Sequence, residues 1–150
     1  DSRSENRSAF ATKCLARNFS YHTLITMGPH DPKFEGLDGL LELDRQVIEV
    51  GNGYWVAIRA RLVPKDAGRP HGIEYALTFH TPGGRRLVGY DNAHAPHARS
   101  GPSGRSRRPV EFDHVHRRHR VKRYLFETPG KLLRDFWADV ETMLKEEGIT

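Results

Sequence analysis

Apolar and polar residues alternate along residues 54–63, and this two-residue period is the strongest constraint on the fold. Successive side chains of a β-strand point to opposite faces of the sheet. One predicted face carries Tyr54, Val56, Ile58, Ala60 and Leu62, and the other carries Trp55, Ala57, Arg59 and Arg61. The first set is expected to be buried, so Arg59 and Arg61 should project from the opposite face.

Further strands are predicted on both sides of this run. Residues 72–80 and 85–90 flank the tight turn 81–84, which predicts an antiparallel hairpin. Another strand is predicted over residues 40–50, ending at the turn Gly51-Asn52-Gly53. A last strand is expected to begin in the basic run 117–123 and to include Tyr124 and Phe126.

The C-terminal region predicts one amphipathic helix. Thr128 is a favourable N-cap, Pro129 suits the first helical position, and Gly148 is a natural stop. Between them lies an apolar stripe at helical spacing, made of Leu132, Leu133, Phe136, Trp137, Val140, Met143 and Leu144. The predicted fold class is α+β, with an antiparallel sheet of about five strands and the C-terminal helix packed on one face.

The chain is expected to hold a single domain. Residues 1–36 are polar and turn-rich, which predicts a poorly structured N-terminal arm. The α+β domain is expected over residues 37–150, with a mobile basic loop at 93–112. The sequence begins without Met, and one hypothesis is that native translation starts at Met27.

Charge and cysteine content narrow the class of protein. The formal net charge of +5 favours an anionic partner, with nucleic acid as the default. The single cysteine, Cys14, excludes an intramolecular disulfide and a cysteine metal cage, which fits a reducing cytosol. No apolar run approaches the roughly 20 residues that span a bilayer. A soluble cytoplasmic protein with no membrane partner is expected.

Chemistry-bearing side chains gather at two points of the chain. Tyr90-Asp91-Asn92 ends the 85–90 strand, and Asp113-His114-Val115-His116 follows a loop later. If residues 113–116 are extended, His114 and His116 point to one side and Asp113 and Val115 to the other. Asp91 and Asn92 are expected to meet the two imidazoles. The alternative for Asp91-Asn92 is an ordinary turn.

Three interpretations of the histidines stay open. Two imidazoles can act as acid and base or bind phosphate, because histidine titrates near neutral pH. They can also bind a divalent metal, with Asp91 or a loop imidazole such as His94 or His97 as a further ligand. The third interpretation is a solvated basic loop without chemistry.

Basic residues cluster in the second half of the chain, and such a surface holds phosphates with little sequence preference. The cluster consists of Arg85, Arg86, Arg105, Arg107, Arg108, Arg117, Arg118, Arg120, Lys122 and Arg123. Tyr75, Tyr90 or Tyr124 can add base stacking. The predicted substrate-binding residues are Tyr90, Asn92, Arg59, Arg85, Arg117 and Arg120.

The order of several short motifs resembles the TumE family of toxin–antitoxin toxins. These motifs are Val88-Gly89-Tyr90-Asp91-Asn92, Asp113-His114-Val115-His116, Tyr124-Leu125-Phe126 and the run from Leu132 to Val140, preceded by Val63-Pro64 and His71-Gly72-Ile73-Glu74-Tyr75. The resemblance covers residues 40–147. It implies a small cytoplasmic prokaryotic toxin whose site contains Tyr90, Asp91, Asn92, Asp113, His114 and His116. The chain departs from the family in residues 93–112, where members have a short Gly/Lys-rich link. This insertion leaves open whether Asn92 and His114 meet, and it can instead form a phosphate-binding flap.

The favoured function is a type II toxin that acts on RNA and is neutralised by a cognate antitoxin. The expected chemistry is metal-independent cleavage by 2′-OH attack, without a cofactor. His114 and His116 would act as base and acid, Asp91 would orient an imidazole, and Arg117 or Arg120 would stabilise the phosphorane-like charge. One alternative is a metal-dependent nuclease or phosphotransferase that uses Asp91, His114 and His116 as ligands. Another is a non-catalytic nucleic-acid-binding module. Self-association into a homodimer is a further option.

Overall fold

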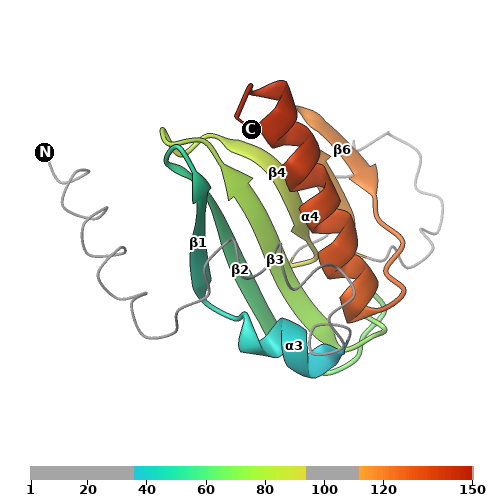
Figure 1. Cartoon of the computed structure of the whole chain (residues 1–150). Coiled ribbons are helices and arrows are strands. Elements are labelled where there is room, and N and C mark those ends of the chain that lie inside the picture. Colours follow the sequence, from blue (N-terminus) through green and yellow to red (C-terminus); the bar gives the residue numbers. More distant parts are fainter. Residues whose placement is uncertain (1–35, 94–111, 150) are drawn as a thin grey trace, which may run out of the picture.

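The computed structural model describes residues 36–93 and 112–149, which form one sheet and two helices (Figure 1). The six strands lie in sequence order and each is antiparallel to its neighbour. The elements are α3 (Leu37–Glu42), β1 (Gln46–Gly51), β2 (Tyr54–Leu62), β3 (Ile73–His80), β4 (Arg86–Asp91), β5 (His114–Arg117), β6 (Arg120–Arg123) and α4 (Pro129–Glu146). The α+β prediction is confirmed, with one strand more than expected.

Two of the predicted strands are wrong in detail. The segment 37–42 is a helix, not the start of a strand, and its Leu40 packs in the core. The alternating Leu41 and Leu43 that suggested a strand sit beside Leu37 and Leu40, which have helical spacing. In the basic run, Arg118 adopts a left-handed conformation with φ 53°. The chain therefore turns at Arg118, and two short strands replace the single one predicted.

The core lies between α4 and one face of the sheet. Thr128 caps α4 by accepting a hydrogen bond from the Lys131 amide at 3.1 Å, as the sequence predicted. The buried stripe of α4 includes Leu132, Phe136 and Val140. It meets the alternating buried residues of the central strands, which are Val56, Ile58, Tyr75, Leu77, Phe79, Val88 and Tyr90. Within the described residues, no helix is both long and apolar enough to cross a membrane.

Two carboxylates of α4 tie the helix to the sheet. Asp139 Oδ2 accepts from the Tyr90 hydroxyl at 2.6 Å and from Arg117 Nε at 2.7 Å. Asp135 Oδ2 accepts from the Tyr124 hydroxyl at 2.8 Å, one helical turn earlier. Since each carboxylate receives a phenol at a fixed position, these bonds set how α4 lies along the sheet.

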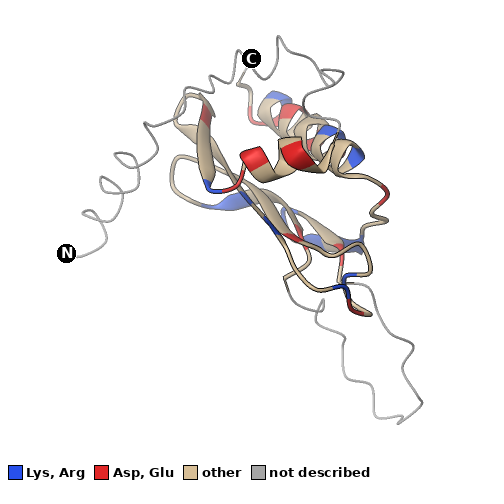
Figure 2. Ribbon diagram, turned by 90° about the horizontal axis from the view of Figure 1, so that it is seen from below, with Lys and Arg blue, Asp and Glu red and all other residues tan. Residues whose placement is uncertain are grey.

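The face of the sheet opposite α4 is called here the distal face. Residues directly opposite each other in antiparallel strands share a face, so the ladders place on it Trp55, Ala57, Arg59, Ala76, Thr78, Gly89, Asp91, His114 and His116. Arg59 is exposed there, as predicted. Both helices lie on the other side of the sheet, and acidic residues mark both of them (Figure 2).

The buried tyrosines predict a loss of stability at high pH. Burial and neighbouring carboxylates, Asp113, Asp139 and Asp135 in turn, raise the pKa of Tyr75, Tyr90 and Tyr124 well above its usual value. The unfolded chain therefore releases these protons first, so the contribution of these tyrosines to the free energy of unfolding should be constant below pH of about 10 and be lost above it. Phenolate absorbance should rise together with loss of circular dichroism. Tyr90→Phe should remove part of the cooperative rise in phenolate absorbance. Formation of phenolates without loss of circular dichroism would contradict the prediction.

Candidate functional site

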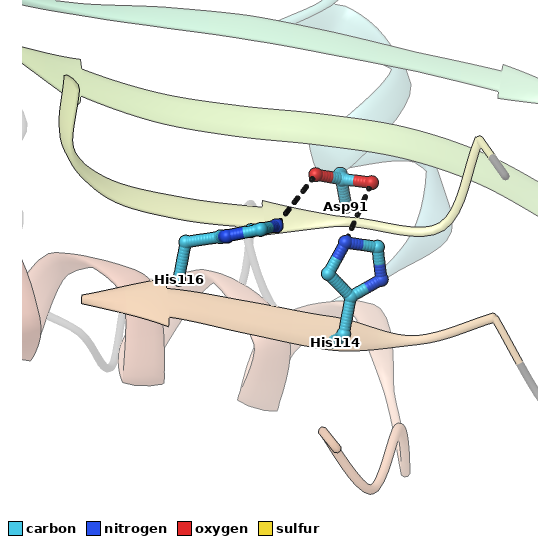
Figure 3. A group of neighbouring side chains, drawn as sticks. All are labelled: Asp91, His114 and His116. Carbon is cyan, nitrogen blue, oxygen red and sulfur yellow. Dashed lines mark ion pairs between the residues drawn. The ribbon is translucent and has the colours of Figure 1, made fainter. Parts of the chain in front are cut away.

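The register between β4 and β5 brings Asp91, His114 and His116 together on the distal face (Figure 3). Asp91 lies directly opposite His114, and His116 lies two residues further along the same strand. Asp91 Oδ1 is 3.1 Å from His114 Nε2, and Asp91 Oδ2 is 3.7 Å from His116 Nε2. The predicted meeting of Asp91 with both imidazoles is confirmed. Asp91 is part of a strand, so the turn alternative is wrong for it.

The tautomer of His114 is fixed by its second ring nitrogen. His114 Nδ1 lies 2.6 Å from the carbonyl oxygen of Phe112. A carbonyl can only accept, so Nδ1 must carry a proton and donate it. In the neutral ring, Nε2 then carries the lone pair, and it lies 3.1 Å from Asp91 Oδ1. His114 is therefore oriented by the backbone, with its second nitrogen near the carboxylate.

One oxygen atom of Asp91 is buried without a hydrogen bond to any described residue. Asp91 is 7% exposed, and its Oδ1 is buried without a hydrogen-bond partner in the described part of the chain. The contact with His114 Nε2 is short, but its geometry does not make a hydrogen bond. Buried polar atoms are nearly always satisfied, and exceptions gather at functional sites. The three side chains can thus either move protons or hold a cation, because their ligand atoms all lie within 4.8 Å of one another.

A β-bulge brings Arg86 to the distal face, beside the three side chains. Simple alternation puts Arg86 on the buried face with Val88 and Tyr90. The register shift at Phe79 and His80 instead pairs Arg86 with His80, on the distal face. A Cβ built on Gly89 would lie 3.1 Å from Arg86 Cδ, so the arginine side chain passes over this glycine. Because Gly89 lies opposite His116, Arg86 lies beside the histidine pair.

His80 and Trp55 form the neighbouring part of the distal face. Their rings stack at 4.0 Å with an interplanar angle of 8°. Burial and then the charge of Arg86 lower the pKa of His80, while its bond to the Gly84 carbonyl opposes this shift. A neutral imidazole stacked on an indole makes His80 a packing residue, in contrast to His114 and His116.

Asn92 and Asp113 belong to a separate, buried network. Asp113 accepts from the Tyr75 hydroxyl at 2.6 Å, from His71 Nε2 at 3.0 Å and from Asn92 Nδ2 at 3.2 Å. Asn92 also bonds the backbone of Tyr75 and Ile73. Every strong donor and acceptor of these two side chains is used to join β3, β4 and β5. Asn92 was predicted to bind substrate, but the structure gives it a structural set of partners.

The other predicted substrate-binding residues are divided between the two sides. Tyr90 is buried and bonded to Asp139, and Tyr75 and Tyr124 are also buried, so none of the three presents a ring for base stacking. Arg117 pairs with Asp139 on the helix side, and Arg120 lies opposite Arg117 and shares its face. Arg85 is exposed in the turn before β4. His94, His97, Arg105, Arg107 and Arg108 lie outside the described residues, as do the N-terminal arm and most of the basic loop.

Two arginines near the site, Arg86 and Arg123, were predicted as members of the basic cluster but not as substrate-binding residues. Arg86 depends on a bulge, which has no marker in the sequence apart from Gly89. Arg123 lies directly opposite His114 in the β5–β6 ladder, and its place follows from the unforeseen turn at Arg118. Splitting the basic run at its centre would have located Arg123.

Comparison with known families agrees with the motif resemblance. A family model described as Toxin TumE matches residues 41–144, which is more than half of the chain. The match spans the sheet from β1 to β6 and nearly all of α4. No curated protein and no solved structure gives a significant match.

The two buried aspartates should respond differently to the same substitution. Asp113→Asn replaces an oxygen that accepts several bonds with an NH₂ group facing donors, and should lower the free energy of unfolding by about 2 kcal/mol or more. Asp91→Asn removes a carboxylate whose Oδ1 lacks a bond, and should change it by less than about 1 kcal/mol. Denaturant unfolding measures both. Equal destabilisation by the two substitutions would contradict this assignment of roles.

Proposed function

The chain belongs to the TumE toxin family, and we propose that it arrests growth by cleaving RNA at Asp91, His114 and His116. The family implies an antitoxin partner. The observation that carries the proposal is the convergence of one carboxylate and two imidazoles on a face that also presents arginines. A cytoplasmic RNA substrate and a neutralising antitoxin are parts of the same proposal.

The arginines of the distal face suit a phosphate backbone. Within the described residues, Arg59 and Arg86 have no carboxylate partner, and both are exposed. Arg59 lies opposite Ala76, whose small side chain separates it from Asp91 on the next strand. Arg86 lies on the other flank, beside His116. An RNA strand that crosses β2, β3 and β4 would therefore meet a cation on each side of the site.

The proposed reaction is attack of a ribose 2′-OH on the adjacent phosphorus. The O2′–P bond forms, the P–O5′ bond breaks, and the 2′-hydroxyl proton is removed while the 5′-oxygen leaves with a proton. The products are a 2′,3′-cyclic phosphate and a 5′-hydroxyl. Arg86 would stabilise the charge that develops on the phosphoryl oxygens.

The position of the histidines bears on how they share this work. Their rings lie 4.8 Å apart on one strand, and both Nε2 atoms face the same carboxylate. In-line attack needs a base and an acid on opposite sides of the phosphorus, which two groups directed at one point do not provide. The geometry favours joint action of the three residues over a division into one base and one acid. His116, whose side chain is 20% exposed, is the member best placed to meet the substrate.

Loss of any one of the three groups should abolish toxicity. His116→Ala and Asp91→Asn are expected to lower RNA cleavage by at least about 100-fold, because general acid–base catalysis contributes on that scale. His119→Ala is the matched control, since His119 is an exposed imidazole in the β5–β6 turn. Growth after induction and cleavage of purified RNA measure the effect. If His116→Ala arrests growth and cleaves RNA like the parent, the protein is not a nuclease at this site.

Arg86 should matter for RNA binding even though sequence alternation hides it. Arg86→Gln is expected to weaken RNA binding by about tenfold, the value of a charge-assisted contact. It should also reduce the salt dependence of the binding constant by about one unit, the contribution of one phosphate contact. Arg45→Gln, at an exposed arginine before β1, is the control. Equal salt dependence in the two variants would remove Arg86 from the RNA surface.

A further inference from the structure

We propose that Asp91, His114 and His116 bind one divalent transition-metal ion, with Zn²⁺ as the probe of choice. Two imidazole nitrogens and one carboxylate are a recognised donor set for such ions, whereas Mg²⁺ and Ca²⁺ prefer oxygen donors alone. Three residues from two adjacent strands supply these donors without any rearrangement of the backbone. The inference stands on the geometry of the protein and deepens the proposed function without depending on it.

The proton on His114 Nδ1 prepares Nε2 for a metal. Histidines that ligate metals usually donate their other ring N–H to a carbonyl or carboxylate, which fixes the tautomer. His114 makes this bond to the Phe112 carbonyl at 2.6 Å. Its Nε2 then carries a lone pair and lies 3.1 Å from an anionic oxygen. Two electron-rich atoms at this distance repel each other unless a cation lies close to both.

The buried oxygen of Asp91 favours a cation over a shared proton. The contact between His114 Nε2 and Asp91 Oδ1 is misaligned for a hydrogen bond, so a proton shared between these two atoms would not satisfy Oδ1. Asp113 shows how this fold treats a carboxylate that is meant to be structural, because it receives a phenol, an imidazole and an amide. Asp91 lies one strand away and is almost as buried, and its ion pairs with described residues are a misaligned contact with His114 and a longer one with His116.

The spacing of the ligand atoms suits a small ion. Bonds of about 2.0–2.2 Å at tetrahedral angles place neighbouring ligand atoms about 3.3 Å apart. Asp91 Oδ1 lies 3.1 Å from His114 Nε2 and Asp91 Oδ2 lies 3.7 Å from His116 Nε2. With one ligand atom from each residue, all three lie within 4.8 Å of one another, so side-chain rotation would bring them to this spacing. Three protein ligands leave a fourth position for water or a phosphate oxygen, as in catalytic zinc sites. His116 is the most exposed of the three side chains, so this position should open on its side.

Metal binding should be measured on the full chain, without RNA and without a histidine tag. Protein stripped with a chelator is expected to take up one equivalent of Zn²⁺ by calorimetry and by metal analysis after dialysis. With Co²⁺ it should show the visible absorption of a low-coordinate ion, and X-ray absorption should report two imidazole ligands. Asp91→Asn and His116→Ala are expected to weaken Zn²⁺ binding by more than about 100-fold, because loss of a direct ligand exceeds the effect of an outer partner. His119→Ala should bind like the parent.

The outcomes separate this inference from the proposed function. Failure to bind one equivalent, or binding that Asp91→Asn and His116→Ala leave unchanged, overturns the metal site. The spectrum of the parent protein decides the matter even if a variant folds poorly, because a Co²⁺ site without imidazole ligands also overturns it. Stoichiometric metal without RNA cleavage supports the metal site and overturns the proposed nuclease. RNA cleavage by metal-free protein, unaffected by a chelator, supports the proposed nuclease and overturns the metal site.

Discussion

The β4–β5 register is the constraint on which the candidate site depends. Four cross-strand pairs define it, and they place Asp91 opposite His114 and Gly89 opposite His116. A slip of one residue would turn both histidines toward α4 and would expose Val115. The register is enforced from the helix side, where Tyr90 and Val115 are buried as a pair. The arrangement of the three candidate side chains is therefore secured by packing on the opposite face of the same two strands.

Asp91 and His114 of the candidate site each have a neighbour in the sequence with a structural role. Asn92 follows Asp91, and Asp113 precedes His114. The alternation of a strand sends the neighbours to the other side, where Asn92 and Asp113 bond each other at 3.2 Å. The Tyr124 amide also donates to the Asp113 carbonyl at 3.0 Å, which anchors the chain after β6 to the start of β5. This buried network holds the ends of β4 and β5 together below the site, so Asp91 can keep an unsatisfied oxygen that the fold does not need for stability.

Much of this arrangement could be predicted from the sequence, because the signals are periodic. The alternation of residues 54–63 and 72–80 and the stripe of α4 identified most of the core, and the spacing of His114 and His116 put both imidazoles on one side. Leu62 was also predicted to be buried, but it is 61% exposed at the end of β2. Features that depend on single backbone conformations were missed. The turn at Arg118 divides the basic run into two strands. No glycine marks this turn in the sequence, because Arg118 itself adopts the positive φ. The bulge at Phe79 and His80 moves Arg86 to the other face of the sheet. The two-residue alternation of a regular strand cannot predict such a one-residue shift in register.

The two sides of the sheet also differ in how their arginines are neutralised. On the helix side, Arg117 pairs with Asp139, and Arg118 pairs with Glu146 and Glu147 at 3.2 Å and 2.9 Å. A paired cation contributes little field beyond its partner, because salt screens what remains within about 8 Å at physiological ionic strength. Arg59 and Arg86 on the distal face have no carboxylate partner among the described residues. Arg120 and Lys122 lie on the helix side, whereas Arg61 on the distal face pairs with Glu74. Arg59 and Arg86 therefore add positive charge to the face that carries Asp91, His114 and His116. A bound metal ion would add to the same field, so phosphate binding and the proposed chemistry would be favoured on one side of the molecule, leaving α4 to stabilise the fold.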